Sequence, residues 1–473
     1  VYKRQERTQV VDARGRMVIP GINDGHSHPV WGALKQLYQC NFPFSSSPKQ
    51  VLAAIAECVE KNPQAEWIQG GQWTSNFFVD NVIPSPAKFL DQVADGKAVL
   101  LRDDSGHNLW VNSKALALMG LDSSSPDPRG GSYSRDPETG ELTGLLLEAF
   151  TAAKNVLPAY TAEQYREAAR FAVSSANSFG ITGIKDASAE EPEVAGFHAL
   201  EQAGELSLRV TAALIESSDD SDFDLDIQWL QRVRDKYETP LINTSATKIF
   251  LDGVPTASRT AAMLEPYLPE QEGGELVSGY LHVEPGPLRD AVTQLDALGF
   301  TVKIHAAGDR SVRVALDAIE AARKANGNSE LRHELAHAGY ISEEDLPRFA
   351  ELNAVADLSP YIWSPSPIID SVVTAVGSPR GEQYWPVKSL MESGAPLLAG
   401  SDWPAAAANM SPWAAIEALV TRTDPVGDYP GQLWPEEAIS LEQALEIFTL
   451  QSARALRMGD NTGSMEIGKS ADL

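Results

Sequence analysis

The chain has 473 residues, which is long for one domain, so we expect a large domain that carries a smaller unit. Its 38 Lys and Arg against 65 Asp and Glu give a net charge of −27, which argues against nucleic acid and anionic membrane surfaces as partners. Cys40 and Cys58 are too few for a disulfide framework, and no apolar run of about 18 residues predicts a membrane span. We therefore expect a cytoplasmic protein that acts on a small molecule, with a homodimer left open.

The two ends of the sequence need separate treatment. Residues 1–5, VYKRQ, match the translation of a sequencing-library transposon end, so we interpret them as an assembly scar outside the fold. The last residues, 468–473, stop where an apolar strand is expected to begin. Both observations predict that the ends of the folded unit are incomplete.

Eight short apolar runs rich in β-branched residues follow one another along the chain, most of them separated by amphipathic helical stretches. The runs span residues 17–23, 183–186, 208–215, 246–251, 300–304, 331–336, 354–358 and 396–400. In the helical stretch 162–178, Tyr165, Ala169 and Val173 recur at helical spacing. Strand and helix alternating eight times predict an α/β fold, a (β/α)8 TIM-type barrel.

The interval 39–160 is too long for one strand-to-helix connection. Within it, residues 51–61 indicate a helix, 99–102 a strand, and 123–144 a loop rich in Ser, Pro, Gly and Asp. We therefore assign 39–160 to an inserted α+β subdomain or lid, and 19–38 with 161–459 to the barrel.

Histidines and one aspartate stand where predicted strands end. His26 and His28 follow the first run at positions i and i+2, which share one face of a strand. His305, His337 and Asp402 follow three later runs in the same way, and active sites of such barrels lie at these carboxyl ends. Imidazole and carboxylate ligands suit zinc first, while manganese, iron and nickel stay open.

Lys248 ends the fourth predicted strand and is a candidate for bridging two metal ions. Desolvation and nearby positive charge lower the pKa of a lysine, and the neutral amine can react with carbon dioxide to give an anionic carbamate. The alternative is an ion-paired or outward-pointing structural lysine.

Six segments in order resemble the amidohydrolase superfamily, and more narrowly its family 3, which includes N-substituted formamide deformylases. They are GINDGHSH at 21–28, KIFLDG at 248–253, HAAGDR at 305–310, ELAHA at 334–338, GSDWP at 400–404 and GSMEIGKSAD at 463–472. The resemblance extends from about residue 10 to 473.

The resemblance implies two zinc ions. His26 and His28 would bind one ion with Asp402, His305 and His337 would bind the other, and carboxylated Lys248 would bridge them beside a bridging hydroxide. It also implies a small β-sandwich from the chain ends, of which 6–18 and 460–473 would remain.

Three further residues are candidates for substrate binding. His107 lies in a motif of the insert that matches the family, Arg259 follows the bridging lysine closely, and Trp403 is adjacent to Asp402. For His107 and Arg259 the alternative is a structural role, and for Trp403 it is a place in the core.

The expected activity is metal-assisted hydrolysis of a C–N bond in an amide, formamide, carbamate or cyclic imide, with Asp402 carrying a proton to the leaving nitrogen. A deaminase or a lactonase on the same scaffold is the nearer alternative. A metal-binding protein without turnover is the more distant one.

Overall fold

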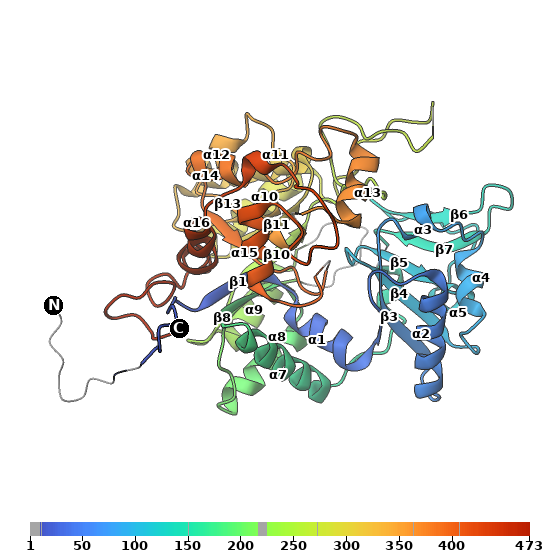
Figure 1. The fold of residues 1–473 in the computed structure, drawn as a ribbon, viewed down its shortest axis with the longest axis horizontal. Helices are drawn as coiled ribbons and strands as arrows, with labels where there is room; N and C mark the ends of the chain where they lie inside the picture. The colour runs from blue at the N-terminus through green and yellow to red at the C-terminus, as the bar shows by residue number, and fades with distance from the viewer. Residues whose placement is uncertain are drawn as a thin grey trace.

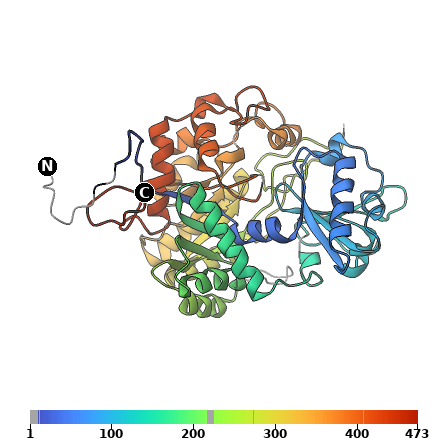
Figure 2. The ribbon, with the colours of Figure 1, turned by 60° about the horizontal axis from the view of Figure 1, so that its bottom comes forward.

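In a computed structural model, which describes residues 10, 12–149, 151–215, 225–271, 273–362, 364–405 and 407–473, eight strands pair in parallel in chain order. They are β1 (Ile22–Ser27), β8 (Ile181–Ala189), β9 (Arg209–Leu214), β10 (Ile242–Phe250), β11 (Thr301–Ala306), β12 (Glu334–His337), β13 (Val355–Leu358) and β14 (Leu397–Ala399). Each predicted apolar run overlaps one of these strands. The TIM-type barrel is thereby confirmed (Figures 1 and 2).

The first and last strands meet at a seam that nearly closes the barrel. The amide of Asp402 donates to the carbonyl oxygen of His26 over 2.6 Å. A Cβ atom added to Gly400 would lie 2.2 Å from the backbone nitrogen of His26, so a larger residue does not fit there. Glycine at this position therefore lets two backbones approach at the seam.

Helices pack around the outside of the barrel (Figure 2). Helix α7 (Ala162–Ser178) begins with a capping box in which Thr161 and Gln164 satisfy each other's backbone amides. Its buried side chains, Ala169 and Val173 among them, recur on one face and pack into the main core. The side chains that the sequence places at the helical period of 3.6 residues therefore form the face of α7 that covers the sheet.

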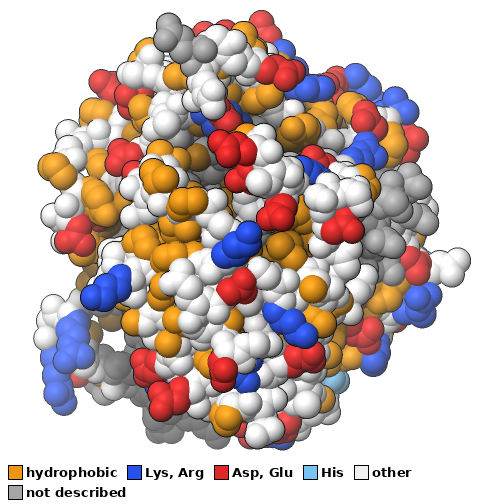
Figure 3. Space-filling view, turned by 90° about the vertical axis from the view of Figure 1, so that its right-hand side faces the viewer, with side chains coloured by type: hydrophobic (Ala, Val, Ile, Leu, Met, Phe, Trp, Pro, Cys, Tyr) orange, Lys and Arg blue, Asp and Glu red, His pale blue; other side chains and the backbone are white. Residues whose placement is uncertain are grey.

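A second sheet lies in the chain between α1 (Pro29–Tyr38) and α7, beside the barrel (Figure 1). Its strand order is β2 (Cys40–Asn41), β3 (Trp67–Trp73), β4 (Ala98–Asp103), β5 (Asn108–Val111), β7 (Leu142–Leu147) and β6 (Ser132–Arg135). Two hydrophobic clusters separate from the main core stabilise it. On the face of the molecule shown in Figure 3, acidic and basic side chains are interspersed with apolar ones.

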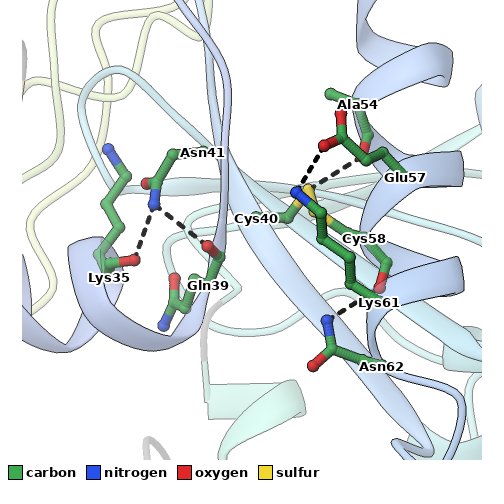
Figure 4. The surroundings of a disulfide bond; sticks show 9 residues. All are labelled: Lys35, Gln39, Cys40, Asn41, Ala54, Glu57, Cys58, Lys61 and Asn62. Atoms are coloured by element: carbon green, nitrogen blue, oxygen red, sulfur yellow. Dashed lines mark hydrogen bonds and ion pairs between the residues drawn. A yellow bond between two sulfur atoms is a disulfide. The ribbon is translucent and has the colours of Figure 1, made fainter.

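Cys40 and Cys58, too few for a disulfide framework, form a single disulfide. The bond ties the start of β2 to helix α2 (Pro48–Lys61), as Figure 4 shows. Disulfides persist mainly in oxidising compartments, so the pairing counts against the cytoplasmic assignment. Among the helices in the described part of the chain, none is long and apolar enough to cross a membrane.

The two chain ends run next to each other without forming strands. The amide of Gly21 donates to the carbonyl oxygen of Asp472 over 2.7 Å, and the Arg209 guanidinium reaches the Asp472 carboxylate at 3.0 Å. The described residues of 10–18 and 460–473 contain no strand, so the partial sandwich stays a prediction. The proposed scar at 1–5 lies outside the described residues.

We expect the disulfide to stabilise the insert. Closing a loop across a sequence separation of 18 residues should contribute about 3 kcal/mol by restricting the unfolded chain. The Cys40→Ser/Cys58→Ser variant should therefore unfold at lower urea concentration than the oxidised protein, with alkylation and mass spectrometry used to confirm the thiol state. Equal stability of the two proteins, or full alkylation of the unreduced wild type, would contradict this expectation.

Candidate metal centre

The five predicted ligands come together at the carboxyl ends of the barrel strands. His26 lies in β1 and His28 directly after it, His305 lies in β11, His337 ends β12, and Asp402 follows β14. All five line one cavity of about 670 Å³, and Lys248 of β10 lines it too. The placement predicted from the strand ends therefore holds for every one of these side chains.

Asp402 is the hub of the cluster. Its Oδ1 lies 3.4 Å from Nε2 of His26 and 3.3 Å from Nε2 of His28, and its Oδ2 lies 3.9 Å from Nδ1 of His337. The ring centroids of His305 and His337 are 4.7 Å apart. His26, His337 and Asp402 offer ligand atoms that all lie within 4.8 Å of one another. This group contains His26 and His337, which the expected division assigns to different ions. The division of ligands between two ions stays a prediction.

The donor set fits a divalent cation. Nε2 of His26 is buried and has no hydrogen-bond partner among the described residues, which is costly for an imidazole unless a metal takes the lone pair. Burial lowers the pKa values of His26, His305 and His337, which keeps their imidazoles neutral as metal ligands must be. Burial raises the pKa of Asp402, but His26 and His28 more than offset this, so the carboxylate stays charged.

A buried chain of alternating charges lies beneath His26. Nδ1 of His26 is 2.6 Å from Oδ2 of Asp357, which also binds the ammonium of Lys303. Lys303 lies 2.9 Å from Glu334, and Glu334 lies 2.6 Å from Lys185. Burial would lower the pKa of Lys303, but Asp357 and Glu334 raise it above its ordinary value. With Nδ1 engaged by Asp357, Nε2 of His26 is the nitrogen left for a metal.

The other side of the cluster is oriented in a similar way. Nδ1 of His305 lies 3.0 Å from Oδ1 of Asp252, whose carboxylate also accepts the amides of Ala307 and Gly308. Nδ1 of His28 lies 3.0 Å from the hydroxyl of Ser188. These contacts fix the imidazole planes, so the rings do not depend on a ligand for their orientation.

Lys248 has the environment that carbamate formation requires. Its side chain is buried in β10, and burial together with Lys303 lowers its pKa to about 7. A substantial fraction is therefore neutral amine at neutral pH, and that fraction rises with pH. Only the neutral amine can add carbon dioxide, so the expected carbamate is chemically compatible with this position.

The three candidate substrate-binding residues differ in whether they line the cavity. His107 lines the cavity, whereas Arg259 and Trp403 are not among the lining residues. The guanidinium of Arg259 donates to the carbonyl oxygens of Leu268 and Ala257 at 3.1 and 2.8 Å, which gives it a loop-stabilising contact. Trp403 is 3% exposed and belongs to the main core. The structure therefore supports a substrate contact for His107 but not for the other two.

Glu148 is a cavity residue that sequence reasoning missed. Its Oε2 lies 2.7 Å from Nδ1 of His107. Burial lowers the pKa of His107 and raises that of Glu148, but each offsets this for the other, giving about 8 for His107 and about 2 for Glu148. Arg102, Trp31 and Tyr160 also line the cavity. The only available signal was that Glu148 follows an apolar stretch in the insert.

Comparison with known proteins agrees with this geometry. The family model described as amidohydrolase family matches residues 9–473. The chain belongs to the amidohydrolase family. This amidohydrolase is 29% identical to Protein LONG AFTER FAR-RED 3 of Arabidopsis thaliana, over 98% of this chain and 79% of that protein. It is 27% identical to N-substituted formamide deformylase of Arthrobacter pascens, over 98% of this chain and 84% of that enzyme.

Solved structures share the fold of this amidohydrolase. An uncharacterized metal-dependent hydrolase from Pyrococcus horikoshii superposes with a TM-score of 0.70 at 22% identity, covering 96% of this chain and 84% of the other. A related hydrolase from Pyrococcus furiosus gives a TM-score of 0.67 at 23% identity, with 96% and 85% covered. At these identities the likeness supports the barrel with its second sheet and says nothing of substrate.

We predict that Lys303→Met destabilises the amidohydrolase by about 3–5 kcal/mol, because Asp357 and Glu334 would each lose a cation while buried. Urea unfolding measures the loss. Lys61→Met serves as the control, since Lys61 and Glu57 form an exposed pair whose removal should change little. A loss for Lys303→Met no larger than that of the control would show that the buried chain is not required for stability.

Proposed function

We propose that this amidohydrolase is a metal-dependent hydrolase that cleaves the C–N bond of a small amide, formamide, carbamate or cyclic imide. The observation that carries the proposal is the convergence of His26, His28 and His337 on Asp402 at the strand ends, where Nε2 of His26 is buried without a hydrogen-bond partner among the described residues. The cavity volume of about 670 Å³ is in the range of pockets that bind small molecules.

The proposed cofactor is a pair of divalent metal ions, and zinc is the preferred candidate. His26 and His28 with Asp402 would hold one, His305 and His337 the other, and carboxylated Lys248 would bridge. A cation held there lowers the pKa of water and polarises a carbonyl oxygen. Support comes from the fact that all six side chains line one cavity and that burial, together with Lys303, lowers the pKa of Lys248 to about 7.

The residues of the chain would divide the remaining work. Asp402 lies at the centre of the histidine cluster, where its carboxylate can take a proton from the attacking water and deliver it to the leaving nitrogen. Asp357 and Asp252 keep the rings of His26 and His305 in place throughout. The buried position of the cluster limits competing water, which strengthens each electrostatic contact.

A substrate panel tests the proposal. N-formyl and N-acyl amines, a cyclic imide, a lactone and an amino-heterocycle would be incubated with metal-loaded protein. Formamides come first because N-substituted formamide deformylase is among the relatives, at 27% identity. Turnover of a C–N substrate supports the proposal, turnover of only the lactone or amino-heterocycle favours the alternative activities, and no turnover with metal bound favours a binding role.

The bridging role of Lys248 predicts a change in metal content. Wild type prepared with ample zinc and bicarbonate should hold about two ions per chain, and Lys248→Ala should lose at least one of them with most of the activity. A short carboxylic acid in the buffer should restore part of the activity by supplying the missing anion. Elemental analysis giving less than half an ion for wild type, or full activity in Lys248→Met, would rule the bridge out.

Asp402→Asn separates metal binding from proton transfer. Asn keeps one carbonyl oxygen as a donor but cannot take up a proton near neutral pH. Turnover should fall on the order of 10²–10⁴-fold while at least one ion stays bound. A variant that retains metal and turns over within threefold of wild type would show that another group carries the proton.

A further inference from the structure

The inserted subdomain contributes two side chains to the metal cavity. His107 lies in the loop between β4 and β5, and Glu148 follows β7 directly. Both line the cavity, and the ring centroid of His107 is 5.1 Å from that of His305. The insert therefore reaches the same space as the ligands of the barrel.

The Glu148 carboxylate holds the insert and the barrel together at this point. Its Oε2 lies 2.7 Å from Nδ1 of His107, and its Oε1 accepts the hydroxyl of Thr260 over 2.7 Å. Thr260 belongs to the barrel loop that follows β10. The two side chains of the His107–Glu148 pair are only 15% and 6% exposed. One buried carboxylate thus fixes an insert residue relative to the barrel.

The surrounding backbone is shaped for this carboxylate. A Cβ atom added to Gly253 would lie 2.2 Å from Oε1 of Glu148 and 2.3 Å from the hydroxyl oxygen of Thr260. Glu148 itself has φ +49°, in the left-handed region that residues with a Cβ rarely occupy. Strained conformations of this kind persist where the surroundings impose them, often at functional sites.

The consequence for His107 follows from the geometry of imidazole. Because Nδ1 is engaged by Glu148, Nε2 is the ring nitrogen that can contact a molecule in the cavity. His26 and His305 show the same arrangement, with Asp357 and Asp252 on Nδ1. Unlike His26, His107 does not belong to the tight ligand group found among the described residues.

We propose that Glu148 is a positioning residue that holds His107 with Nε2 facing the cavity, where His107 hydrogen-bonds the scissile amide group of the substrate. This inference rests on the proposed hydrolytic function and adds to it a specificity-determining contact from the insert. A residue that contacts the reacting group acts through its orientation, and a small misplacement can cost on the order of 10²-fold in rate.

Glu148→Gln is the central variant. Gln has one acceptor oxygen where Glu148 has two, and it is neutral, so it loses the charge-assisted bond to His107 or has to reverse the direction of the bond with Thr260. We expect kcat/KM on the best panel substrate to fall about 10²-fold, with zinc content unchanged. Glu148→Asp, which keeps both oxygens, should recover part of the loss.

A matched control lies on the outside of the barrel. Glu201 in α8 (Glu191–Gln202) also accepts a threonine hydroxyl, that of Thr239 at 2.8 Å, and lies 3.7 Å from Nδ1 of His198. Glu201→Gln therefore makes the same chemical change away from the cavity. We expect its kcat/KM to stay within twofold of wild type.

A double-mutant cycle distinguishes positioning from general structural support. If Glu148 acts through His107, the variant His107→Gln/Glu148→Gln should be no slower than His107→Gln alone. Fully additive losses in the cycle, a Glu148→Gln rate within threefold of wild type, or loss of zinc from His107→Gln would overturn the inference.

A binding measurement tests the proposed orientation of His107 independently of turnover. In protein labelled with ¹⁵N-histidine, N-methylformamide should shift the Nε2 resonance of His107 in wild type but not in Glu148→Gln. No shift in wild type, or equal shifts in both, would overturn the inference. A chain that hydrolyses nothing on the panel but shows the expected shifts would instead remove the proposed function and keep the positioning role.

Discussion

The barrel depends on a chain of buried charges that runs from Lys185 through Glu334 and Lys303 to Asp357. Barrel interiors are usually filled by branched apolar side chains, and burying charges there costs several kcal/mol per ion unless each is paired. Here every member has an opposite charge beside it, and the last member binds His26. The arrangement that makes the charged interior tolerable is therefore also the one that orients a metal ligand.

Three of the candidate ligands, His26, His28 and Asp402, lie at the seam between the first and last strands, where the two backbones approach closely. Gly400 leaves no room for a side chain against His26. Asp402 has φ +55° and His337 has φ +74°, in a region that residues with a Cβ rarely adopt. Strained backbone of this kind persists where the surrounding structure imposes it, and here it lies at two residues that line the cavity.

The barrel, and the placement of the candidate ligands at its strand ends, could be predicted from the sequence because both follow from local periodicity and one topological rule. Apolar runs identify strands, and parallel strands bring their carboxyl ends to one edge. Cys40 and Cys58 escaped this reasoning, since 18 residues of separation do not show whether two side chains meet. Arg259 and Trp403 do not line the cavity, because proximity in sequence to a ligand does not fix the direction of a side chain.

The remaining contacts could not be predicted because they join distant parts of the chain. Glu148 and Thr260 are 112 positions apart, and Lys185 and Glu334 are 149 apart, so no local pattern links them. The two pairs also act on different functions. The barrel pair lies in the buried charge chain beneath His26, whereas the insert pair holds His107 at the wall of the cavity. Because these pairs share no residue, replacing a member of one leaves the contacts of the other in place, so the cavity wall and the charge chain can be altered separately.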